Sequence, residues 1–379
     1  MAELSQRAKQ ILYACITEFV ATGEPVGSRT LSKRAGIDLS PASIRNVLAD
    51  LEEMGYLHQR HTSAGRVPTD KAFRLFVDAM MEVRQLHPLF AGEVSGVDLA
   101  GTMSPETVRA LKDAIDRYAV LVFHDQSLDD DRLLGLGQLF GPVEPPRNHR
   151  VVRRLKHAEL ADISNLDANN QLRSRDDHRR LDSLGNRLWH SDASFREVPG
   201  ALSMLFAHVV PPVGGETEFA DLRAAYDALS ADMKRSIEDV VAEHSIFYSR
   251  GQLGHTDYTD AERAALPSVR HKLVRVHPGS KRKTLYMGAH ASHIVDWPMP
   301  EGRLLLRDLM EHATQREFIH RHTWRVGDLV IWDNRCTLHR GRAYDDATHP
   351  RDLRRVTTKD TSAPGQVVEA RVPDARASA

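Results

Sequence analysis

The chain has 379 residues and a formal net charge of −1 at neutral pH, and 41% of its residues are apolar while 27% are charged. This length predicts two domains, or one large and one small domain, and the balanced charge means that any nucleic-acid binding must depend on a local arrangement of basic residues. The apolar runs are far shorter than the roughly 18 residues of a membrane helix, the N-terminus lacks an apolar secretory segment, and two distant cysteines cannot form a disulfide framework, so we expect a cytoplasmic protein without a membrane span.

Three helices are predicted near the N-terminus. Apolar residues recur at spacings of three and four over 5–21, which is the pattern of one helix face. A short second helix is expected over 28–35. The third follows at once, because Ser40 is a good N-cap, Pro41 suits the first helical position and Gly55 ends the apolar stripe. Three helices with a tight turn before the third are typical of a helix-turn-helix unit.

The next segment, YLHQRHTSAGRVPTD, predicts a strand, a glycine-containing turn and a return strand, as in a β-wing. The third helix begins with small and hydrogen-bonding side chains that suit base edges in the major groove, and nearby arginines can hold phosphates. The expected DNA contacts are Arg29, Ser43, Arg45, Asn46 and Arg66. A small helical domain used for dimer packing is the alternative, because the charges of this segment nearly balance.

Four runs in this region are specific: GEPVGSRTL, LSPASIRN, DLEEMGYL and HTSAGRVPTD. Through them, residues 3 to about 84 closely resemble the winged-helix domain of the heat-inducible transcription repressor HrcA. The resemblance implies a small winged helix-turn-helix domain over 1–86 that binds DNA. In that family a sensor and dimerisation region follows, and the sequence after residue 86 does not resemble it.

Beyond residue 86 the character of the sequence changes without a linker rich in glycine, serine or proline. Short apolar runs such as YAVLVF and DLVIWD alternate with polar loops, and helical segments such as SPETVRALKDAIDRY and EGRLLLRDLMEHATQREFI lie between them. Many short strands separated by turns predict a β-sandwich or barrel. We expect a mainly β domain with helices over 87–361, followed by a disordered tail over 362–379 that has too little apolar content to pack.

Two His-x-Asp tripeptides are candidate pairs of metal ligands, HSD at 190–192 and HTD at 255–257. Among 20 histidines and 52 acidic residues such tripeptides arise by chance, so neither is decisive alone. The first follows NRLW, a run that can form a strand edge with His190 and Asp192 on the same side. The second lies in the polar loop GQLGHTDYTD. The first is the better candidate, with a structural hydrogen-bonded pair as the alternative.

A third ligand should come from a different strand, and the apolar run DLVIW leads to His339. Two histidines and one carboxylate leave one face of a non-haem Fe(II) open for a co-substrate and oxygen. Such enzymes use a co-substrate that chelates the metal and carries a remote carboxylate, so we expect an arginine that binds this carboxylate. In an extended strand Arg351 and Arg355 share a face while Arg354 points the other way, and two arginines facing one cavity are costly unless anions occupy it. A basic solvated edge strand is the alternative.

Matching runs extend in order along this second region: VSGVDL, YAVLVFHDQ, LFGPVE, ISNL, NRLWHSD, GGETEFADLRAAYDAL, VRVHP, EGRLLLRDLMEHATQ, DLVIWDNR and PRDLRRVT. Through them, residues from about 88 to 361 resemble the TauD/TfdA family of Fe(II)/2-oxoglutarate-dependent dioxygenases. Within that family they are most similar to the 2,4-dichlorophenoxyacetate (aryloxyalkanoate) dioxygenases. The resemblance implies a double-stranded β-helix, or jelly roll, which agrees with the strand pattern.

The resemblance also implies the residues of the site. By the family's pattern, iron is bound by His190, Asp192 and His339. Thr217 and Arg351 hold the distal carboxylate of 2-oxoglutarate. These residue types suit the roles, because an arginine grips a carboxylate through a two-pronged, charge-assisted contact that lysine cannot match.

For the prime substrate the resemblance implies that Arg355 meets an acidic group, with Asn186 as a second contact. The reaction consumes 2-oxoglutarate and O2, with ascorbate as a helpful reductant, and releases succinate and CO2. Hydroxylation beside the ether oxygen of an aryloxyacetate gives a hemiacetal that collapses to a phenol and glyoxylate. Because a guanidinium binds carboxylates and sulfonates in the same way, the alternative substrate is a taurine-like sulfonate.

The two resemblances belong to proteins with unrelated roles, which leaves three interpretations. The protein is a dioxygenase with a vestigial DNA-binding head, a transcription regulator whose dioxygenase domain acts as a sensor, or an enzyme that carries a functionless fusion. The complete ligand set favours catalysis, because a sensor need not keep every ligand. Any homo-oligomer would have to form through the dioxygenase domain, since the dimerisation region of the repressor family is missing.

Overall fold

The computed structural model describes residues 4–33, 37, 39–59, 65–78, 81–146 and 154–362. The chain divides into two compact units, one comprising residues 1–82 with 95–107 and the other residues 83–94 with 108–379. Residues 83–94 belong to the second unit and residues 95–107 to the first, so the boundary predicted after residue 86 falls where the chain passes between the units. The predicted tail lies outside the described residues except for Ser362.

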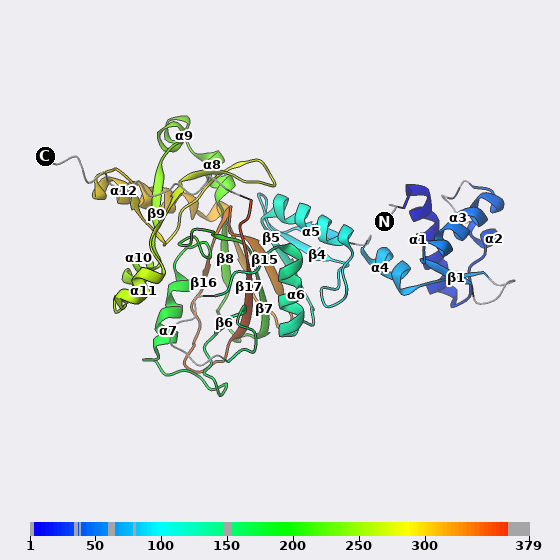
Figure 1. Ribbon diagram of the computed structural model, residues 1–379, viewed down its shortest axis with the longest axis horizontal. Helices are drawn as coiled ribbons and strands as arrows, with labels where there is room; N and C mark the ends of the chain where they lie inside the picture. The colour runs from blue at the N-terminus through cyan, green and yellow to red at the C-terminus, as the bar shows by residue number, and fades with distance from the viewer. Residues whose placement is uncertain are drawn as a thin grey trace. The chain divides into compact units, whose positions relative to one another are not determined.

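The first unit, at the blue end of the chain in Figure 1, consists mainly of short helices. Its elements are α1 (Gln6–Thr22), α2 (Ser28–Leu31), α3 (Pro41–Glu53), β1 (Leu57–Gln59), β2 (Arg66–Pro68) and α4 (Asp70–Asp78). The two strands pair antiparallel, with His58 opposite Val67. Helix α2 begins at Ser28, with Gly27 at the N-cap position, and ends at Leu31, so within the described residues it is shorter than the predicted 28–35.

Helix α3 begins where the sequence predicted. Ser40 Oγ accepts the backbone N–H of Ser43 at 3.1 Å, and Pro41 occupies the first turn. The apolar face of this helix is buried in the core of the unit through Ile44, Leu48 and Leu51. Not all of the predicted α1 stripe is buried, because Val20 is 68% exposed. The helices of this unit are thus stabilised mainly by one shared apolar core.

The remaining strands and helices build the second unit. The strands are β3 (Glu82–Gln85), β4 (Gly92–Ser95), β5 (Val120–Phe123), β6 (Ala161–Ser164), β7 (Gly200–Val209), β8 (Thr217–Asp221), β9 (Val241–His244), β10 (Val269–Lys272), β11 (Val274–Val276), β12 (Lys283–Leu285), β13 (Ala291–Ile294), β14 (Ile319–His322), β15 (Leu329–Asp333), β16 (Thr337–Gly341) and β17 (Asp352–Lys359). The helices are α5 (Pro105–Tyr118), α6 (Asp130–Phe140), α7 (His178–Ser183), η1 (Leu184–Arg187), α8 (Leu222–Ala228), α9 (Ala231–Ile237), α10 (Ile246–Gly251), α11 (Asp260–Ala265), α12 (Met299–Ala313) and η2 (Arg316–Phe318).

Two sheets of the second unit position the site. The larger has the order β3-β4-β5-β15-β7-β17-β6, and the smaller has the order β14-β8-β16. Strand β7 pairs antiparallel with β15 and β17, and β8 pairs antiparallel with β14 and β16. Phe219 of β8 packs against Trp332 of β15, with ring centroids 5.5 Å apart. The inner faces of the two sheets therefore meet in a shared apolar core.

Helices pack against the larger sheet and against a third sheet of the order β10-β9-β13. Helix α6 packs against β7 and β17, and α12 packs against β13 and α8 (Figure 1). The helical segments expected from SPETVRALKDAIDRY and EGRLLLRDLMEHATQREFI are present as α5 and α12, and the apolar runs YAVLVF and DLVIWD contain β5 and β15. Among the described residues, no helix is long and apolar enough to cross a membrane. Cys15 and Cys336 are both free and buried.

Buried histidines make the stability of the fold depend on pH. Burial and the neighbouring charge of Arg275 lower the pKa of His271 from 6.5 to about 3, and burial also holds the pKa of His244 well below that value. Because the unfolded chain takes up these protons near pH 6.5 and the folded chain does not, the free energy of unfolding should fall as the pH drops below about 6.5. The expected slope is roughly 1.4 kcal/mol per pH unit for each such histidine.

Urea unfolding between about pH 7.5 and about pH 4.5 measures this dependence. His271→Gln should flatten the curve below pH 6.5, whereas His58→Gln, which changes an exposed histidine, should leave it unchanged. An equally steep curve for both variants would contradict the prediction.

Candidate active site

The candidate ligands lie on adjacent backbone segments next to the smaller sheet. His190 and His339 of β16 exchange backbone hydrogen bonds of 3.1 and 2.9 Å in an isolated bridge. Asp192 begins a turn in which Ala193 has a φ of 56°. The predicted strand edge over 188–192 is therefore wrong, since only His190 pairs in β fashion. The turn, rather than strand alternation, brings the carboxylate back to the histidines.

The three side chains form a compact, buried donor set. Their ligand atoms all lie within 4.8 Å of one another in the group His190, Asp192 and His339. The Nε2 atoms of His190 and His339 are 3.8 and 3.7 Å from the carboxylate oxygens of Asp192. Because His190 Nδ1 donates to the carbonyl of Leu188 at 2.7 Å, its Nε2 carries the lone pair. Two imidazoles and one carboxylate are the donor set of the facial triad of non-haem Fe(II) oxygenases, so these residues fit an iron ion.

The charge states of the donors suit a divalent cation. Burial lowers the pKa of His190, and burial together with the neighbouring His190 holds the pKa of His339 well below its ordinary value, so both imidazoles are neutral near pH 7. Burial opposes the ionisation of Asp192, but Arg355 and the two histidines outweigh it and lower the pKa of Asp192 to about 2. The site therefore presents one carboxylate and two neutral nitrogen donors.

A buried hydrogen-bond network from the larger sheet orients Asp192. Ser203 Oγ donates to Asp192 Oδ2 at 2.7 Å and accepts from Asn334 Nδ2 at 2.9 Å. The hydroxyl of Thr357 lies 2.9 Å from the same Oγ and must donate to it, because Ser203 has only one proton. The backbone N–H of Asp192 donates to Asn334 Oδ1 at 3.0 Å. Partners of this kind fix the orientation of a metal ligand.

We expect Ser203→Ala to lower the affinity for Mn(II) by roughly 10- to 100-fold, the usual cost of losing a partner of a metal ligand. The variant removes a hydrogen bond from Asp192 and leaves the donors of Asn334 and Thr357 without their acceptor. Titration of the metal-free protein with Mn(II) measures the effect, with the exposed Ser236→Ala as control. Equal affinities of the two variants would show that Asp192 is oriented without Ser203.

A second polar feature lies where β17 begins. Arg351 is only 8% exposed, and its guanidinium donates to the carbonyl of Gly215 at 3.4 Å. Among the described residues, Arg351 Nε has no hydrogen-bond partner and no carboxylate pairs with this side chain. Thr217, two residues after Gly215, is buried and its Oγ1 accepts from Trp324 Nε1 at 3.0 Å. A buried cation without an anionic partner is costly, so this corner fits the distal carboxylate of a bound anion.

Gly215 is adapted to this corner. It has a φ of 74°, and a Cβ at this position would lie 3.4 Å from Arg351 Nε. The 3.4 Å approach to Arg351 is ordinary contact and the tighter neighbour is Pro211 Cγ at 3.0 Å, so glycine is favoured here by the left-handed backbone.

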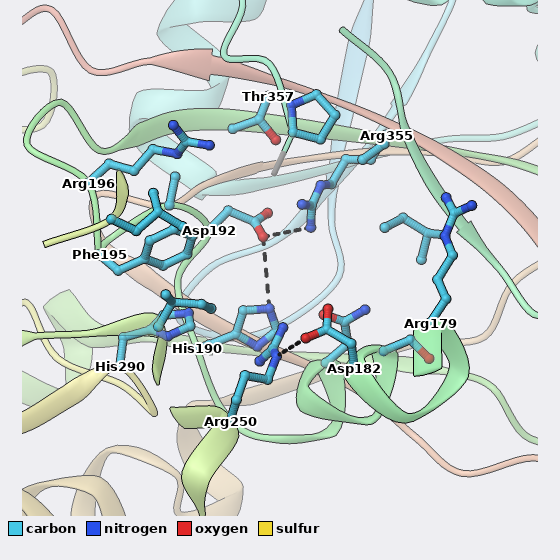
Figure 2. A pocket seen from close by; sticks show the side chains of 18 of the residues that line it. Arg179, Asp182, His190, Asp192, Phe195, Arg196, Arg250, His290, Arg355 and Thr357 are labelled. Atoms are coloured by element: carbon cyan, nitrogen blue, oxygen red, sulfur yellow. Dashed lines mark hydrogen bonds and ion pairs between the residues drawn. The ribbon is translucent and has the colours of Figure 1, made fainter. Parts of the chain in front are cut away.

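A cavity of about 420 Å³ opens beside the donor set (Figure 2). His190, Asp192, Asn186 and Arg355 line it together with apolar and aromatic side chains. These are Ile163, Phe195, Ile246, Phe247, Tyr258 and Leu266. Arg355 Nη1 donates to Asp192 Oδ1 at 2.6 Å, and its Nε has no hydrogen-bond partner among the described residues. The remaining lining is mostly polar and charged, so the cavity combines a guanidinium beside the metal ligands with a wall of mixed character that includes several aromatic side chains.

Known proteins resemble most of the chain. Residues 82–357 match the family model "Taurine catabolism dioxygenase TauD, TfdA family". The chain belongs to the TauD/TfdA family. A 2,4-dichlorophenoxyacetate dioxygenase of Cupriavidus pinatubonensis is 50% identical over 277 residues, which cover 73% of this chain and 96% of that protein. The crystal structure of AAD-2 with Mn(II) and N-oxalylglycine superposes with a TM-score of 0.71 at 48% identity, covering 76% of this chain and all of that one.

Membership of the TauD/TfdA family makes this protein a 2-oxoglutarate-dependent dioxygenase that uses Fe(II), 2-oxoglutarate and O2. The fold is the mixed sheet-and-helix fold of TauD-type structures. The donor set His190, Asp192 and His339 is consistent with this cofactor. Both predictions from the sequence, the family and its cofactors, are confirmed.

The N-terminal part has different relatives. A heat-inducible transcription repressor HrcA of Sorangium cellulosum is 66% identical over 95 residues, which cover 25% of this chain and 27% of that repressor. The chain therefore spans only about a quarter of this repressor's length.

Sequence reasoning missed a further pair of residues in the wall of the TauD/TfdA-family pocket. Arg250 of α10 donates through Nε to Asp182 of α7 at 3.0 Å, as Figure 2 shows. A Cβ on Gly185 would lie 1.9 Å from Arg250 Nη1, so the guanidinium lies directly against this glycine. The pair joins two segments that both line the cavity. The sequence offers one indication of this contact, Gly185 in the run SLGNR, but a glycine does not reveal that Arg250 packs against it.

A second group of potential ligands, His277, Asp333 and Cys336, is also buried and compact. Asp333 already accepts from Arg335 Nε and Nη2 at 2.9 and 2.6 Å, and from His277 Nε2 at 2.9 Å. Since His277 Nδ1 accepts the N–H of Ser280 at 3.0 Å, its Nε2 carries the proton. We interpret this group as a hydrogen-bonded structural network rather than a metal site.

The residues predicted to contact DNA all belong to the first unit, whereas the pocket residues belong to the second. Arg29, Ser43, Arg45 and Asn46 are exposed, and the last three lie on α3, where Ser43 and Asn46 are one turn apart. Ser43 Oγ lies 3.0 Å from Ser40 Oγ. Arg66 begins β2, and its Nε is 2.7 Å from Glu52 Oε2. This ion pair holds Arg66 within the unit.

Proposed function

We propose that this dioxygenase hydroxylates an anionic aryloxyalkanoate beside its ether oxygen and so releases a phenol and a 2-oxo acid. The observation that carries the proposal is the position of Arg355, whose guanidinium binds the ligand Asp192 inside a cavity of mixed lining that also presents the aromatic side chains Phe195 and Phe247. An aryloxyalkanoate has a carboxylate that can pair with the guanidinium and an aromatic ring that can pack against the aromatic side chains. The similarity to a 2,4-dichlorophenoxyacetate dioxygenase supports the same substrate class.

The proposed roles of the residues follow from their positions. Fe(II), held by His190, Asp192 and His339, supplies the activation of O2 that is coupled to decarboxylation of 2-oxoglutarate. Arg351 grips the distal carboxylate of 2-oxoglutarate, with the hydroxyl of Thr217 at the same corner. These contacts fix the co-substrate from the end opposite to its chelating group.

Arg355 holds the substrate carboxylate through its Nε–H, which has no partner among the described residues, while Nη1 binds Asp192. This places the methylene beside the ether oxygen next to the donor set, which determines the bond that reacts. Asn186 contributes a polar contact, and aromatic side chains such as Phe195 surround the substrate ring and exclude water.

The reaction balances without a further reactant. One oxygen atom of O2 enters succinate and the other becomes the new hydroxyl group, while CO2 leaves from 2-oxoglutarate. The resulting hemiacetal loses its hydroxyl proton, its bond to the aryl oxygen breaks, and that oxygen takes up a proton. An aryloxyacetate therefore gives a phenol and glyoxylate.

The test is succinate formation and oxygen uptake by the anaerobically iron-loaded protein with 2-oxoglutarate, with and without 2,4-dichlorophenoxyacetate. We expect turnover that this substrate stimulates and that is lost in His190→Ala. Stimulation by taurine instead would assign a sulfonate substrate. Absence of stimulation by either compound would refute the proposed substrate class.

We propose DNA binding as a second function, with residues 1–86 forming a winged helix-turn-helix domain and residues 87–361 a jelly-roll dioxygenase domain. Exposed Ser43, Arg45 and Asn46 on α3 support it, as does the similarity to HrcA over the same region. The dioxygenase domain would then act as a sensor, and pairing of two chains through it would bring two heads together. A cytoplasmic location fits both functions.

Selection from random DNA duplexes with the full chain tests this function. We expect an enriched sequence whose binding weakens as salt rises, because phosphate contacts release counterions. Arg45→Ala should weaken binding by roughly 10-fold or more, whereas Arg74→Ala, an exposed arginine of α4, should not. If no sequence is enriched even at low salt, DNA binding is refuted and catalysis remains as the function. Light scattering measures whether two chains pair.

A further inference from the structure

The segment ISNL places Asn165 directly beside the start of β17, where no role in the site has been assigned to it. Strands β6 and β17 pair antiparallel, and the last backbone pair of their register is Ser164 opposite Asp352. The next residues along each strand are Asn165 and Arg351. Asn165 is only 6% exposed. It therefore lies against the backbone that carries the buried guanidinium.

The side chain of Asn165 replaces one of the two backbone bonds of the next step in the strand ladder, since the backbone N–H of Asn165 still donates to the carbonyl of Arg351 at 3.3 Å. The backbone N–H of Arg351 donates to Asn165 Oδ1 at 2.8 Å, while the backbone carbonyl of Asn165 accepts from Arg173 at 2.9 Å. The amide Nδ2 donates to the carbonyls of Asp346 and His349, both at 2.9 Å. Because Nδ2 faces two acceptors and Oδ1 faces a donor, the orientation of the amide is unambiguous.

One asparagine thus fixes the whole segment from residue 346 to residue 351. Its side chain makes three hydrogen bonds, two from Nδ2 and one to Oδ1, and each partner is a backbone group of that segment. At its end the guanidinium of Arg351 reaches Gly215, and no acidic side chain among the described residues holds it in place. Its position therefore depends on the backbone that Asn165 anchors.

We propose that Asn165 is a positioning residue for 2-oxoglutarate, acting through Arg351 on the distal carboxylate. The inference rests on the role proposed above for Arg351. A displacement of about 1 Å at a group that orients a reactant can cost about 100-fold, and loss of a residue that orients a binding group commonly costs 10- to 100-fold. Loosening the segment should weaken contact with the distal carboxylate and leave the donor set unchanged.

Two probes separate this role from general damage. N-oxalylglycine carries a distal carboxylate, whereas N-methyloxamate has the same chelating half without it. Calorimetric titration of the Mn(II)-loaded full chain gives the affinity for each probe. Asn165→Ala should bind N-oxalylglycine about 10- to 100-fold more weakly, with N-methyloxamate affected by less than about 3-fold. Affinity for Mn(II) itself should not change.

Asn165→Ser provides a second variant that keeps one hydrogen bond, in case the alanine variant does not fold. Asn169→Ala is the matched control, because Asn169 is an exposed asparagine of the following loop. Arg351→Ala tests the underlying role separately, and unchanged binding of N-oxalylglycine there would refute the role of Arg351. If Arg351→Ala weakens binding but both Asn165 variants bind as the wild type does, or lose both probes equally, the positioning role is overturned.

Discussion

Replacing Asp192 with alanine is expected to abolish substrate-stimulated succinate formation and to weaken Mn(II) binding by more than about 100-fold. Loss of a residue that only orients a ligand already costs up to about 100-fold, so loss of the one anionic ligand should cost at least as much. The variant also leaves Arg355 without the carboxylate that it contacts at 2.6 Å. His190→Ala and His339→Ala should have effects of the same order, because each removes one of two neutral donors.

The second His-x-Asp tripeptide provides the matched control for this experiment. Asp257 lines the outer cavity but belongs to neither compact group of potential ligands found among the described residues. Asp257→Ala should therefore bind Mn(II) as the wild type does. Equilibrium dialysis of the metal-free proteins measures both affinities. Similar Mn(II) affinities of Asp192→Ala and the wild type would show that the metal is bound elsewhere.

Local patterns in the sequence predicted the parts of the structure that local forces determine. Ser40 and Pro41 begin α3 because a side-chain cap and a fixed φ act within one turn. The apolar runs around β5 and β15 are strands buried at every position, because continuous apolar character and β-propensity act along a few residues. The strand proposed for 188–192 failed, since a tripeptide cannot indicate that Ala193 turns the chain.

The partners of the site could not be predicted from the sequence because they meet only through the fold. Ser203 reaches Asp192 from β7, and Asn334 reaches it from the loop after β15, 142 positions away in the chain. Arg250 packs against Gly185 in the same manner. The resemblance to the family identified the metal ligands, because they lie in motifs that can be matched in the sequence. A motif does not identify the distant side chains that orient a ligand.

Arg355→Gln is expected to lower kcat/KM for 2,4-dichlorophenoxyacetate by roughly 10- to 150-fold. A hydrogen bond to a charged group contributes about 1.5–3 kcal/mol, and each 1.4 kcal/mol corresponds to a factor of ten. Glutamine keeps a polar side chain but has no positive charge to attract the substrate carboxylate. Decarboxylation of 2-oxoglutarate in the absence of substrate should persist, because Arg351 and the donor set remain intact, so more succinate than phenol should form.

Arg354→Gln is the matched control, since the adjacent arginine on β17 turns to the opposite face and pairs with Asp130 at 2.6 Å. It should keep the ratio of phenol to succinate of the wild type. The methyl ester of the substrate adds a second comparison, because it lacks the anion that Arg355 is proposed to bind. If Arg355→Gln slows the ester and the acid to the same extent, Arg355 acts through Asp192 rather than through the substrate carboxylate. A selective loss with the acid assigns Arg355 to substrate recognition, because only the acid offers it a charged partner.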